Sequence, residues 1–267
     1  MTNEFSHLLP SVQAITIKAG KATLSFFQDD ATKVYKKEDG SPVTKADQAS
    51  ENIIIPALQS LTPNIPVIAE EQAEAGDAPD VRNVDTFWLV DPLDGTKEFI
   101  KGSPDYTVNI GLVHKGTPVM GVVYIPVTGD MYYGGEQIGA FYNDIAIHTN
   151  TPPANNRLNI ILSKAAPSSS QIRAYLKEKG IEIGDYVMRG SSLKFCLIAD
   201  GQADLYPRFV PTYEWDTAAA HAILLQSGGD ILDFKTKQRL AYGKFKNNYL
   251  NGYILTANNT VLETLAI

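Results

Sequence analysis

The stretch "TFWLVDPLDGTKEF", Thr86–Phe99, decides how this chain is interpreted, because a buried strand runs directly into two carboxylates. Thr86–Val90 is a short apolar run of residues that favour β-structure, and it predicts a strand. Asp91 and Asp94 follow it, separated by a proline and a leucine. Two carboxylates held close together repel each other unless a proton or a cation lies between them. The stretch therefore predicts a cation site at the end of a strand. The alternative is an Asx turn in which Asp94 caps the next helix.

The turn chemistry of this stretch suits a metal site. Pro92 fixes its own φ and has no amide donor, so the two carboxylates and the Leu93 carbonyl can be aimed at one point. Gly95 permits close approach of the backbone. Thr96–Glu98 resembles the opening of a helix, whose free amides favour a phosphate. Hard oxygen ligands beside a phosphate site are typical of Mg²⁺.

Three further acidic residues are candidates, and each has a plainer alternative. Glu70 and Glu71 end the run Ile65–Glu71, which is predicted as a strand. Neighbouring residues on a strand face opposite sides, so only one of the two glutamates would join a site. The alternative is a solvated acidic loop. Asp216 precedes a predicted helix and is either an oxygen ligand or that helix's N-cap. Asp47 lies in the predicted helix 44–61, where an exposed helix charge is the alternative.

Cationic and hydroxyl side chains in the second half of the chain suggest an anion site. In "RGSSLKF", Arg189–Phe195, Ser191 or Ser192 could cap a helix, and Lys194 could face an anion. "LYPRF" adds Tyr206 as an aromatic face and Arg208 as a cation. Arginine is favoured where phosphate is gripped by paired donors.

Composition and charge narrow the class of protein. The chain has 267 residues, 44% hydrophobic and 20% charged, and is long enough for one large α/β unit or two packed subdomains. The net charge of −7, from 23 basic and 30 acidic residues, disfavours binding of a nucleic-acid polymer. The sequence contains no apolar run of about 18 residues and no secretory leader pattern, so a cytoplasmic protein is expected.

Several other chemistries are disfavoured by what the sequence lacks. Cys196 is the only cysteine, which excludes an intrachain disulfide, and its apolar neighbours indicate a core residue. The four histidines are scattered, which disfavours a zinc site. The chain has neither a G-x-S-x-G pattern nor a P-loop, against a serine hydrolase and a P-loop kinase. Nothing in the sequence indicates the oligomeric state.

The pattern of elements predicts two subdomains. The first half is expected to hold helices over 5–27 and 44–61, a strand and its return over 33–44, and strands over 106–116, 117–126 and 130–144. Composition changes in the polar, Pro/Asn-rich stretch 148–159, beyond which strands and helices alternate as in a helix-covered sheet. We therefore predict an α+β subdomain over 1–152 with most candidate metal ligands, and an α/β subdomain over 153–267 with the substrate-binding residues and Asp216.

Taken in order, five motifs resemble one family. They are "VTKADQASE", "IAEE", "WLVDPLDGTKEF", "GSSLKFCLIADGQADLYPR" and "EWDTAAAHA". This set, spanning about Val43 to His221, resembles the inositol monophosphatase superfamily of Mg²⁺-dependent, lithium-sensitive phosphatases. D-P-L-D-G-T followed by a later W-D is highly specific. "KEF" after the aspartates, "GSSLKFCL" and "LYPRF" resemble most the bacterial bisphosphate nucleotidase branch. The resemblance implies a layered αβαβα sandwich of the inositol monophosphatase and fructose-1,6-bisphosphatase type.

The resemblance also implies roles for individual residues. By position, the ligands of two or three Mg²⁺ ions would be Glu70, Asp91, the Leu93 carbonyl, Asp94 and Asp216. The pair that orients and deprotonates the attacking water would be Asp47 and Thr96. Substrate contacts are expected from Gly95, Thr96, Ser192, Lys194 and Arg208.

The implied reaction is hydrolysis of the 3′-phosphate of adenosine 3′,5′-bisphosphate, and of its sulfated form, to remove a by-product of sulfate activation. An inositol or sugar phosphate substrate is the alternative within the superfamily. Peripheral contact with the cytoplasmic face of the inner membrane is a further expectation from the bacterial relatives.

The sequence departs from the family pattern at two places, and its residues also bear on two other functions. Lys164-Ala165-Ala166 stands where Arg-Ser-His is common, which puts adenosine selectivity in question, and Ala220 stands where many relatives have glycine. A haloacid dehalogenase-type phosphatase needs D-x-D-G-T, whereas this chain has D-x-x-D, which places the carboxylates differently. A non-catalytic metal-binding protein is disfavoured because both expected water-activating residues are present.

Overall fold

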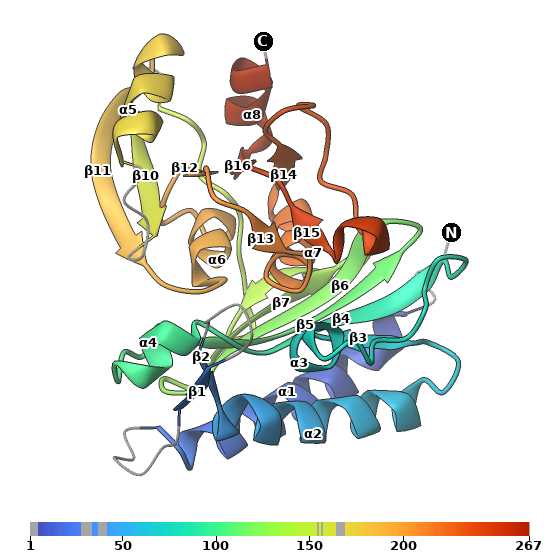
Figure 1. Cartoon of the computed structure of the whole chain (residues 1–267). Coiled ribbons are helices and arrows are strands. Elements are labelled where there is room, and N and C mark those ends of the chain that lie inside the picture. The colour runs from blue at the N-terminus through green and yellow to red at the C-terminus, as the bar shows by residue number, and fades with distance from the viewer. Residues whose placement is uncertain are drawn as a thin grey trace.

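The computed structural model describes residues 5–27, 34–36, 42–153, 155, 157–163 and 169–266. In this part of the chain, helices and sheets alternate in five layers (Figure 1). A helix pair lies under a seven-stranded sheet, a second pair lies between this sheet and a five-stranded sheet, and a third pair covers the outer face. The predicted αβαβα sandwich is confirmed.

The seven-stranded sheet forms the base of the molecule. Its strands, in spatial order, are β3 (Val67–Ala69), β4 (Thr86–Asp94), β5 (Thr107–His114), β6 (Thr117–Ile125), β7 (Asp130–Gly135), β8 (Gly139–Tyr142) and β9 (Ile145–Ala146). All neighbours are antiparallel except β3 and β4, which are parallel. Helices α1 (Leu9–Leu24) and α2 (Lys45–Leu61) pack on one face.

Alternation along β4 explains why both faces of this sheet are buried. Trp88 and Val90 pack in the core beneath α1 and α2, whereas Phe87 and Leu89 pack in the core that contains the middle helices. Successive strand residues point to opposite faces, so one apolar run serves two cores. Asp91, the next residue after Val90, therefore faces the middle helix layer.

The five-stranded sheet forms the upper half. Its strands, in order, are β11 (Glu182–Arg189), β10 (Arg157–Ser163), β12 (Leu205–Arg208), β16 (Ile254–Asn258) and β14 (Gly229–Asp233). Helices α6 (Leu193–Ala199) and α7 (Ala218–Ser227) lie between the two sheets, and α5 (Ser169–Glu178) and α8 (Asn259–Ala266) cover the outer face. The short elements are η1 (Ser6–Leu8), β1 (Val34–Lys36), β2 (Pro42–Thr44), α3 (Glu70–Glu74), α4 (Thr96–Ile100), β13 (Thr212–Tyr213), η2 (Phe245–Asn247) and β15 (Leu250–Asn251).

Two glycines let α7 contact the lower sheet directly. Gly111 of β5 and Gly121 of β6 are Cα partners across the sheet. A Cβ atom on Gly121 would lie 1.9 Å from the carbonyl oxygen of Ala219, and one on Gly111 would lie 2.8 Å from the Ala219 nitrogen. This glycine notch therefore admits the backbone of α7 at a separation that any side chain would prevent.

The predicted elements agree with the structure in outline and differ at two points that matter for the site. The helices predicted over 5–27 and 44–61 are confirmed as η1 with α1 and as α2. The strand predicted to end at Val90 continues to Asp94. Glu70 was predicted to end a strand, but it begins α3, so that prediction was wrong.

Other predictions are left untested. The turn predicted within 33–44 and the Lys164-Ala165-Ala166 stretch lie at least partly outside the described residues. The predicted boundary between 152 and 153 falls between β9 and β10 and stays a prediction. In the described part of the chain, no helix is both long and apolar enough to cross a membrane.

Candidate active site

A bulge in β4 brings two carboxylates to one side of the sheet. Asp91 pairs with Asn109 of β5 and Asp94 pairs with Thr107, so β4 carries one more residue than β5 between these pairs. Residues three apart on a regular strand point to opposite faces, and the extra residue reverses this. Proline is tolerated at such a bulge because it has no ladder N–H to donate. The Leu93 N–H donates to Asp91 Oδ1 at 3.0 Å, which fixes the turn.

Gly95 ends the strand in a conformation that the turn requires. Its φ of 96° lies in the left-handed region, which favours glycine. A Cβ atom at this position would lie 3.2 Å from the carbonyl oxygen of Asp105 and 3.3 Å from Cβ of Ser191. The chain can therefore pass close to both halves of the molecule immediately after the carboxylates.

Three carboxylates converge between the sheets. One oxygen each from Asp91, Asp94 and Asp216 lie within 4.8 Å of one another. The first two come from β4 and the third from the turn before α7, which the glycine notch seats on the sheet. These oxygens are hard ligands, so this carboxylate trio could hold a divalent cation.

The helix-cap alternatives for Asp94 and Asp216 were wrong, whereas the expected Asx turn is present in the hydrogen bond from the Leu93 N–H to Asp91 Oδ1. The residue at the N-cap of α4 is Gly95 rather than Asp94, and the residue at the N-cap of α7 is Thr217 rather than Asp216. Asp216 Oδ2 instead accepts a hydrogen bond from the Tyr213 N–H at 2.9 Å. Neither aspartate is therefore explained as a helix cap.

The pKa of Asp91 shows that the protein poorly compensates the negative charge of the carboxylates around it. Burial raises the pKa of Asp91 well above its ordinary value, and the charges of Glu70, Asp94 and Asp216 raise it further. Asp91 is only 1% exposed. Glu70 is outside the carboxylate trio, but its effect on Asp91 places it within the same field.

Asp216 is affected by the charge of Asp94 and by two cations. Burial, followed by the charge of Asp94, raises the pKa of Asp216 to about 7. The Tyr213 N–H and the cations of Arg208 and Lys194 oppose this rise. The trio therefore carries excess negative charge that protons or a bound cation would neutralise.

Thr96 and Asp47 are in contact, as their predicted partnership requires. The Thr96 hydroxyl donates to Asp47 Oδ1 at 3.4 Å and lies 3.4 Å from the Leu93 carbonyl oxygen. Asp47 is 1% exposed in the first turn of α2, so the alternative of an exposed helix charge was wrong. Ser50, one turn further along α2, donates to the Pro92 carbonyl oxygen at 2.7 Å and ties the helix to the bulge.

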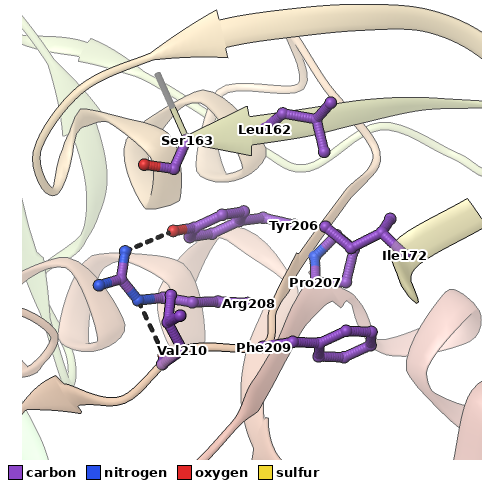
Figure 2. A pocket seen from close by; sticks show the side chains of 8 residues that line it. All are labelled: Leu162, Ser163, Ile172, Tyr206, Pro207, Arg208, Phe209 and Val210. Carbon is purple, nitrogen blue, oxygen red and sulfur yellow. Dashed lines mark hydrogen bonds between the residues drawn. The ribbon is translucent and has the colours of Figure 1, made fainter. Parts of the chain in front are cut away.

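Arg208 lies at the end of β12, beside the pocket in Figure 2. Its guanidinium donates to the Tyr206 hydroxyl at 3.1 Å and to the Val210 carbonyl oxygen at 3.2 Å. Burial opposes its charge, yet Tyr206 and then the carboxylates of Asp216 and Asp94 raise the pKa of Arg208. The pocket is lined by Leu162, Ser163, Ile172, Tyr206, Pro207, Arg208, Phe209 and Val210.

Lys194 is a second cation near the trio. It is 4% exposed, its ammonium lies 5.7 Å from the centre of the Tyr206 ring, and it donates to the Ser191 carbonyl oxygen. Ser191 has a φ of 47°, a left-handed value that is uncommon outside glycine. The chain is therefore turned sharply where α6 begins, next to the candidate site.

Ser192 connects the two halves of the site. Its hydroxyl lies 2.5 Å from Asp94 Oδ2 and 2.6 Å from the carbonyl oxygen of Asp216. The Asn109 side-chain amide of β5 donates to the same hydroxyl at 3.0 Å. Sequence reasoning missed Asn109, since it appears only as an ordinary polar residue within an apolar strand.

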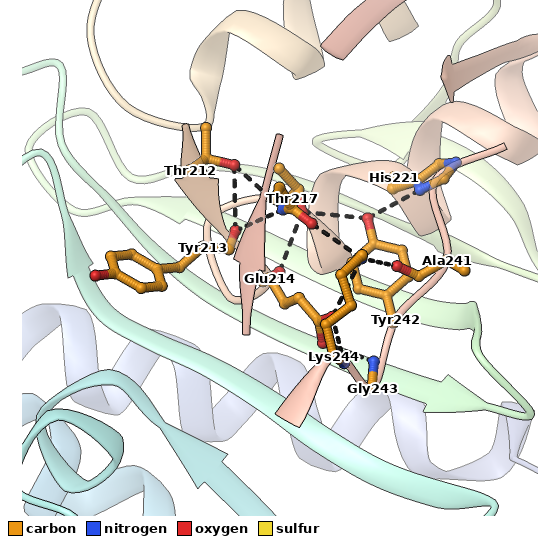
Figure 3. Close-up of polar contacts among 10 residues, drawn as sticks. Thr212, Tyr213, Glu214, Thr217, His221, Ala241, Tyr242, Gly243 and Lys244 are labelled. Atoms are coloured by element: carbon orange, nitrogen blue, oxygen red, sulfur yellow. Dashed lines mark hydrogen bonds and ion pairs between the residues drawn. The ribbon is translucent and has the colours of Figure 1, made fainter. Parts of the chain in front are cut away.

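A buried polar network holds the turn that carries Asp216 (Figure 3). The Glu214 carboxylate accepts hydrogen bonds from the Gly243 N–H at 2.7 Å and the Lys244 N–H at 2.8 Å, and pairs with the Lys244 ammonium at 3.2 Å. The Asn251 amide donates to the Tyr213 carbonyl oxygen at 3.0 Å. Sequence reasoning missed these contacts, and the glutamate two residues before Asp216 was their only local signal.

The layered fold and the carboxylate trio are expected of the inositol monophosphatase family, and comparison with known proteins gives the same family. Residues 6–267 match the inositol monophosphatase family, and the chain belongs to it. Curated relatives carry a more specific name. One, the 3′(2′),5′-bisphosphate nucleotidase CysQ of Salmonella typhimurium, is 40% identical over 231 residues, or 86% of this chain and 92% of that protein.

Solved structures support the same assignment. The crystal structure of CysQ from Bacteroides thetaiotaomicron matches with a TM-score of 0.76 at 34% identity, covering 96% of this chain and 98% of that one. An inositol monophosphatase from Zymomonas mobilis matches with a TM-score of 0.79 at 23% identity, covering 99% and 98%, which shows a shared fold. The chain is accordingly a hydrolase of a metal-dependent phosphatase family, and its carboxylate trio is the candidate metal centre.

Proposed function

We propose that the protein is a Mg²⁺-dependent phosphatase that hydrolyses the 3′-phosphate of adenosine 3′,5′-bisphosphate, and of its sulfated form, to leave the 5′-phosphate in place. The observation that carries this proposal is a pair of cations, the buried Lys194 and the half-buried Arg208, within the field of a carboxylate trio. A metal centre suits one phosphate and two cations suit a second. A bisphosphate uses both, whereas an inositol monophosphate uses one.

The donor set fits magnesium. All candidate ligands are hard oxygens, and the raised pKa of Asp91 marks a charge that the protein itself leaves uncompensated. We assign the binding of two or three Mg²⁺ ions to Glu70, Asp91, the Leu93 carbonyl, Asp94 and Asp216. When bound, Mg²⁺ neutralises phosphate charge, lowers the pKa of water and stabilises the leaving oxygen.

The water-activating role falls to Thr96 and Asp47. An ionised Asp47 accepts the Thr96 hydroxyl hydrogen, as the 3.4 Å contact supports. The lone pairs of the Thr96 oxygen then accept a hydrogen from the attacking water and orient it. Water attacks phosphorus while one of its protons passes by way of the Thr96 hydroxyl to Asp47, the P–O3′ bond breaks, the leaving oxygen takes a proton from solvent, and the released phosphate keeps the other water hydrogen. Such displacement depends mainly on positioning and on neutralised charge.

The second phosphate is assigned to the cationic side of the site. Lys194 and Arg208 bring positive charge there, and Gly95 and Thr96 approach the reacting phosphate from the other side. Cytoplasmic location and peripheral membrane contact remain predictions from the sequence.

Phosphate release by the purified protein tests the proposal. Adenosine 3′,5′-bisphosphate, adenosine 3′-monophosphate and inositol 1-phosphate are compared in Mg²⁺, in EDTA, and in Mg²⁺ with Li⁺. We expect the bisphosphate to have the highest kcat/KM, EDTA to abolish activity and Li⁺ to inhibit it. A large preference for inositol 1-phosphate would favour the alternative substrate class.

Arg208→Gln sharpens the test, because it removes a charge from the assigned second-phosphate site. We expect kcat/KM to fall about 100-fold for the bisphosphate, as for loss of a charge-assisted contact, and by much less for adenosine 3′-monophosphate. An equal loss on both nucleotides would contradict the assignment of Arg208 to the second phosphate.

A further inference from the structure

We infer that Ser192 and Asn109 form a clamp that sets the separation of Asp94 and Asp216 for metal binding. This inference rests on the proposed metal site. The clamp acts through the ligands and is a positioning device. It joins β4 and β5 of the lower sheet to α6 and to the turn before α7.

The Ser192 hydroxyl contacts three polar groups of the protein. A serine hydroxyl has one hydrogen and two lone pairs. In the structure it lies at 2.5 Å from an Asp94 oxygen and 2.6 Å from the Asp216 carbonyl oxygen, and accepts from Asn109 at 3.0 Å. Ser192 is 1% exposed. The one hydroxyl hydrogen is thus shared between two acceptor oxygens, one lone pair accepts from Asn109, and two of the three partners belong to residues of the carboxylate trio.

The contacts of Ser192 cross a long stretch of sequence. Asp94 belongs to β4, whereas Ser192 and Asp216 belong to the second half of the chain. A hydroxyl that bridges a side-chain oxygen of one ligand and the backbone oxygen of another limits how far the two can separate. Mutual repulsion of the carboxylates acts in the opposite direction when no cation is bound.

Asn109 supports the clamp from the neighbouring strand. It is the Cα partner of Asp91, so the two side chains lie on the same face of the sheet. It is 1% exposed, and its nitrogen is used by Ser192. Within the described residues its Oδ1 is buried without a hydrogen-bond partner, and so is the hydroxyl oxygen of Thr107, the Cα partner of Asp94.

Two buried acceptors beside the paired aspartates need a donor that the described protein groups do not supply. Buried polar atoms are nearly always satisfied, and a water is the usual partner where protein groups are lacking. A cation that keeps part of its hydration shell brings such waters. The polar side of β5 is thus suited to a hydrated cation held by the trio.

Calorimetric titration with MgCl₂ of the purified, metal-free full chain tests the clamp. We expect Ser192→Ala to weaken Mg²⁺ binding about 10–100-fold, as is usual for groups that orient metal ligands. The matched control is Ser227→Ala, because Ser227 is also buried, at 3% exposed, and donates a single bond of 3.0 Å to the Leu224 carbonyl oxygen at the end of α7. We expect the control to bind Mg²⁺ as the unmodified protein does.

A second variant keeps the inference testable if Ser192→Ala fails to fold. Asn109→Ala removes the support but keeps the serine, and we expect a smaller loss of about 3–10-fold in Mg²⁺ affinity, within the range for such groups. Because Asn109 supports Ser192, the double variant should lose less Mg²⁺ affinity than the product of the two single losses. Additive losses would show that the two residues act separately.

The outcomes separate this inference from the proposed function. No Mg²⁺ binding by the unmodified protein would overturn the metal site itself. Tight binding that is unchanged in Ser192→Ala would overturn the clamp and leave the metal site standing. Equal losses in Ser192→Ala and Ser227→Ala would assign the effect to general loss of core packing and would also overturn the clamp.

Discussion

Asp216→Asn should stabilise the metal-free protein, and more at high pH than at low pH. The pKa of Asp216 is raised from an ordinary 3.8 to about 7. A carboxyl with a raised pKa contributes stability that is complete below the unfolded value and is lost as the pH rises to the folded value. The protein should thus lose stability between pH 3.8 and about 7, and asparagine, which does not ionise, avoids that loss.

The size of the effect follows from the two pKa values. The interval from 3.8 to about 7, at about 1.4 kcal/mol per pH unit, corresponds to about 4 kcal/mol. Because Asp216 is only partly buried by its accessible surface, solvent screening reduces this figure, and we expect about 2 kcal/mol at pH 8. For a chain of this length that raises Tm by about 4 °C, with less than half of this gain at pH 5.

Thermal unfolding in EDTA, followed by circular dichroism at pH 5 and pH 8, measures this gain. Mg²⁺ should reverse the order of stability, because it binds the carboxylate and not the amide and so raises the Tm of the unmodified protein more. A variant with the Tm of the unmodified protein at both pH values would refute the claim that Asp216 is ionised against its neighbours. A gain that is larger at pH 5 would refute the sign of the argument.

Three further predictions concern catalysis and packing. Asp91→Asn should lower kcat for phosphate release by several orders of magnitude while the circular dichroism spectrum stays native; near-normal turnover would contradict the site. Thr96→Ala and Asp47→Asn should each lower kcat about 100-fold or more with little change in KM. The double variant should have a kcat no lower than that of the less active single variant. Independent losses would show that the two residues do not act as a unit. Gly121→Ala should destabilise the fold by about 3 kcal/mol or prevent folding, since its Cβ would lie 1.9 Å from a backbone oxygen, and an unchanged urea midpoint would contradict the notch.

The sequence predicted the parts of the site that depend on local chemistry. The paired aspartates, the intervening proline and the glycine after them could be interpreted from D-P-L-D-G alone, because turn chemistry and charge repulsion act over a few residues. Glu70 was misplaced on a strand, although the run "EEQAE" consists of good helix formers that indicate the helix. The extension of β4 to Asp94 depends on its pairing with β5, which no local pattern reveals.

The parts that sequence reasoning missed depend on distant contacts. Asn109 and Ser192 are 83 positions apart, and Ser192 and Asp94 are 98 apart. Asn109 is unremarkable in its own stretch of sequence, and although Ser192 and Asp94 were candidates, the contacts among the three exist only after two sheets and a helix layer are stacked. The hydrogen bonds from the Gly243 and Lys244 N–H groups to the Glu214 carboxylate likewise join residues that are far apart in the sequence.

The glycine notch also affects how the site responds to change elsewhere in the molecule. Because α7 meets the lower sheet backbone to backbone at Gly111 and Gly121, no interchangeable side chain acts as a spacer at these two positions. Altering the size of residues in the outer helix layers should therefore shift those layers while the distance between the aspartates persists. Engineers who wish to retune the metal centre would do better to modify the support beneath α7 than to redesign the surrounding hydrophobic interior.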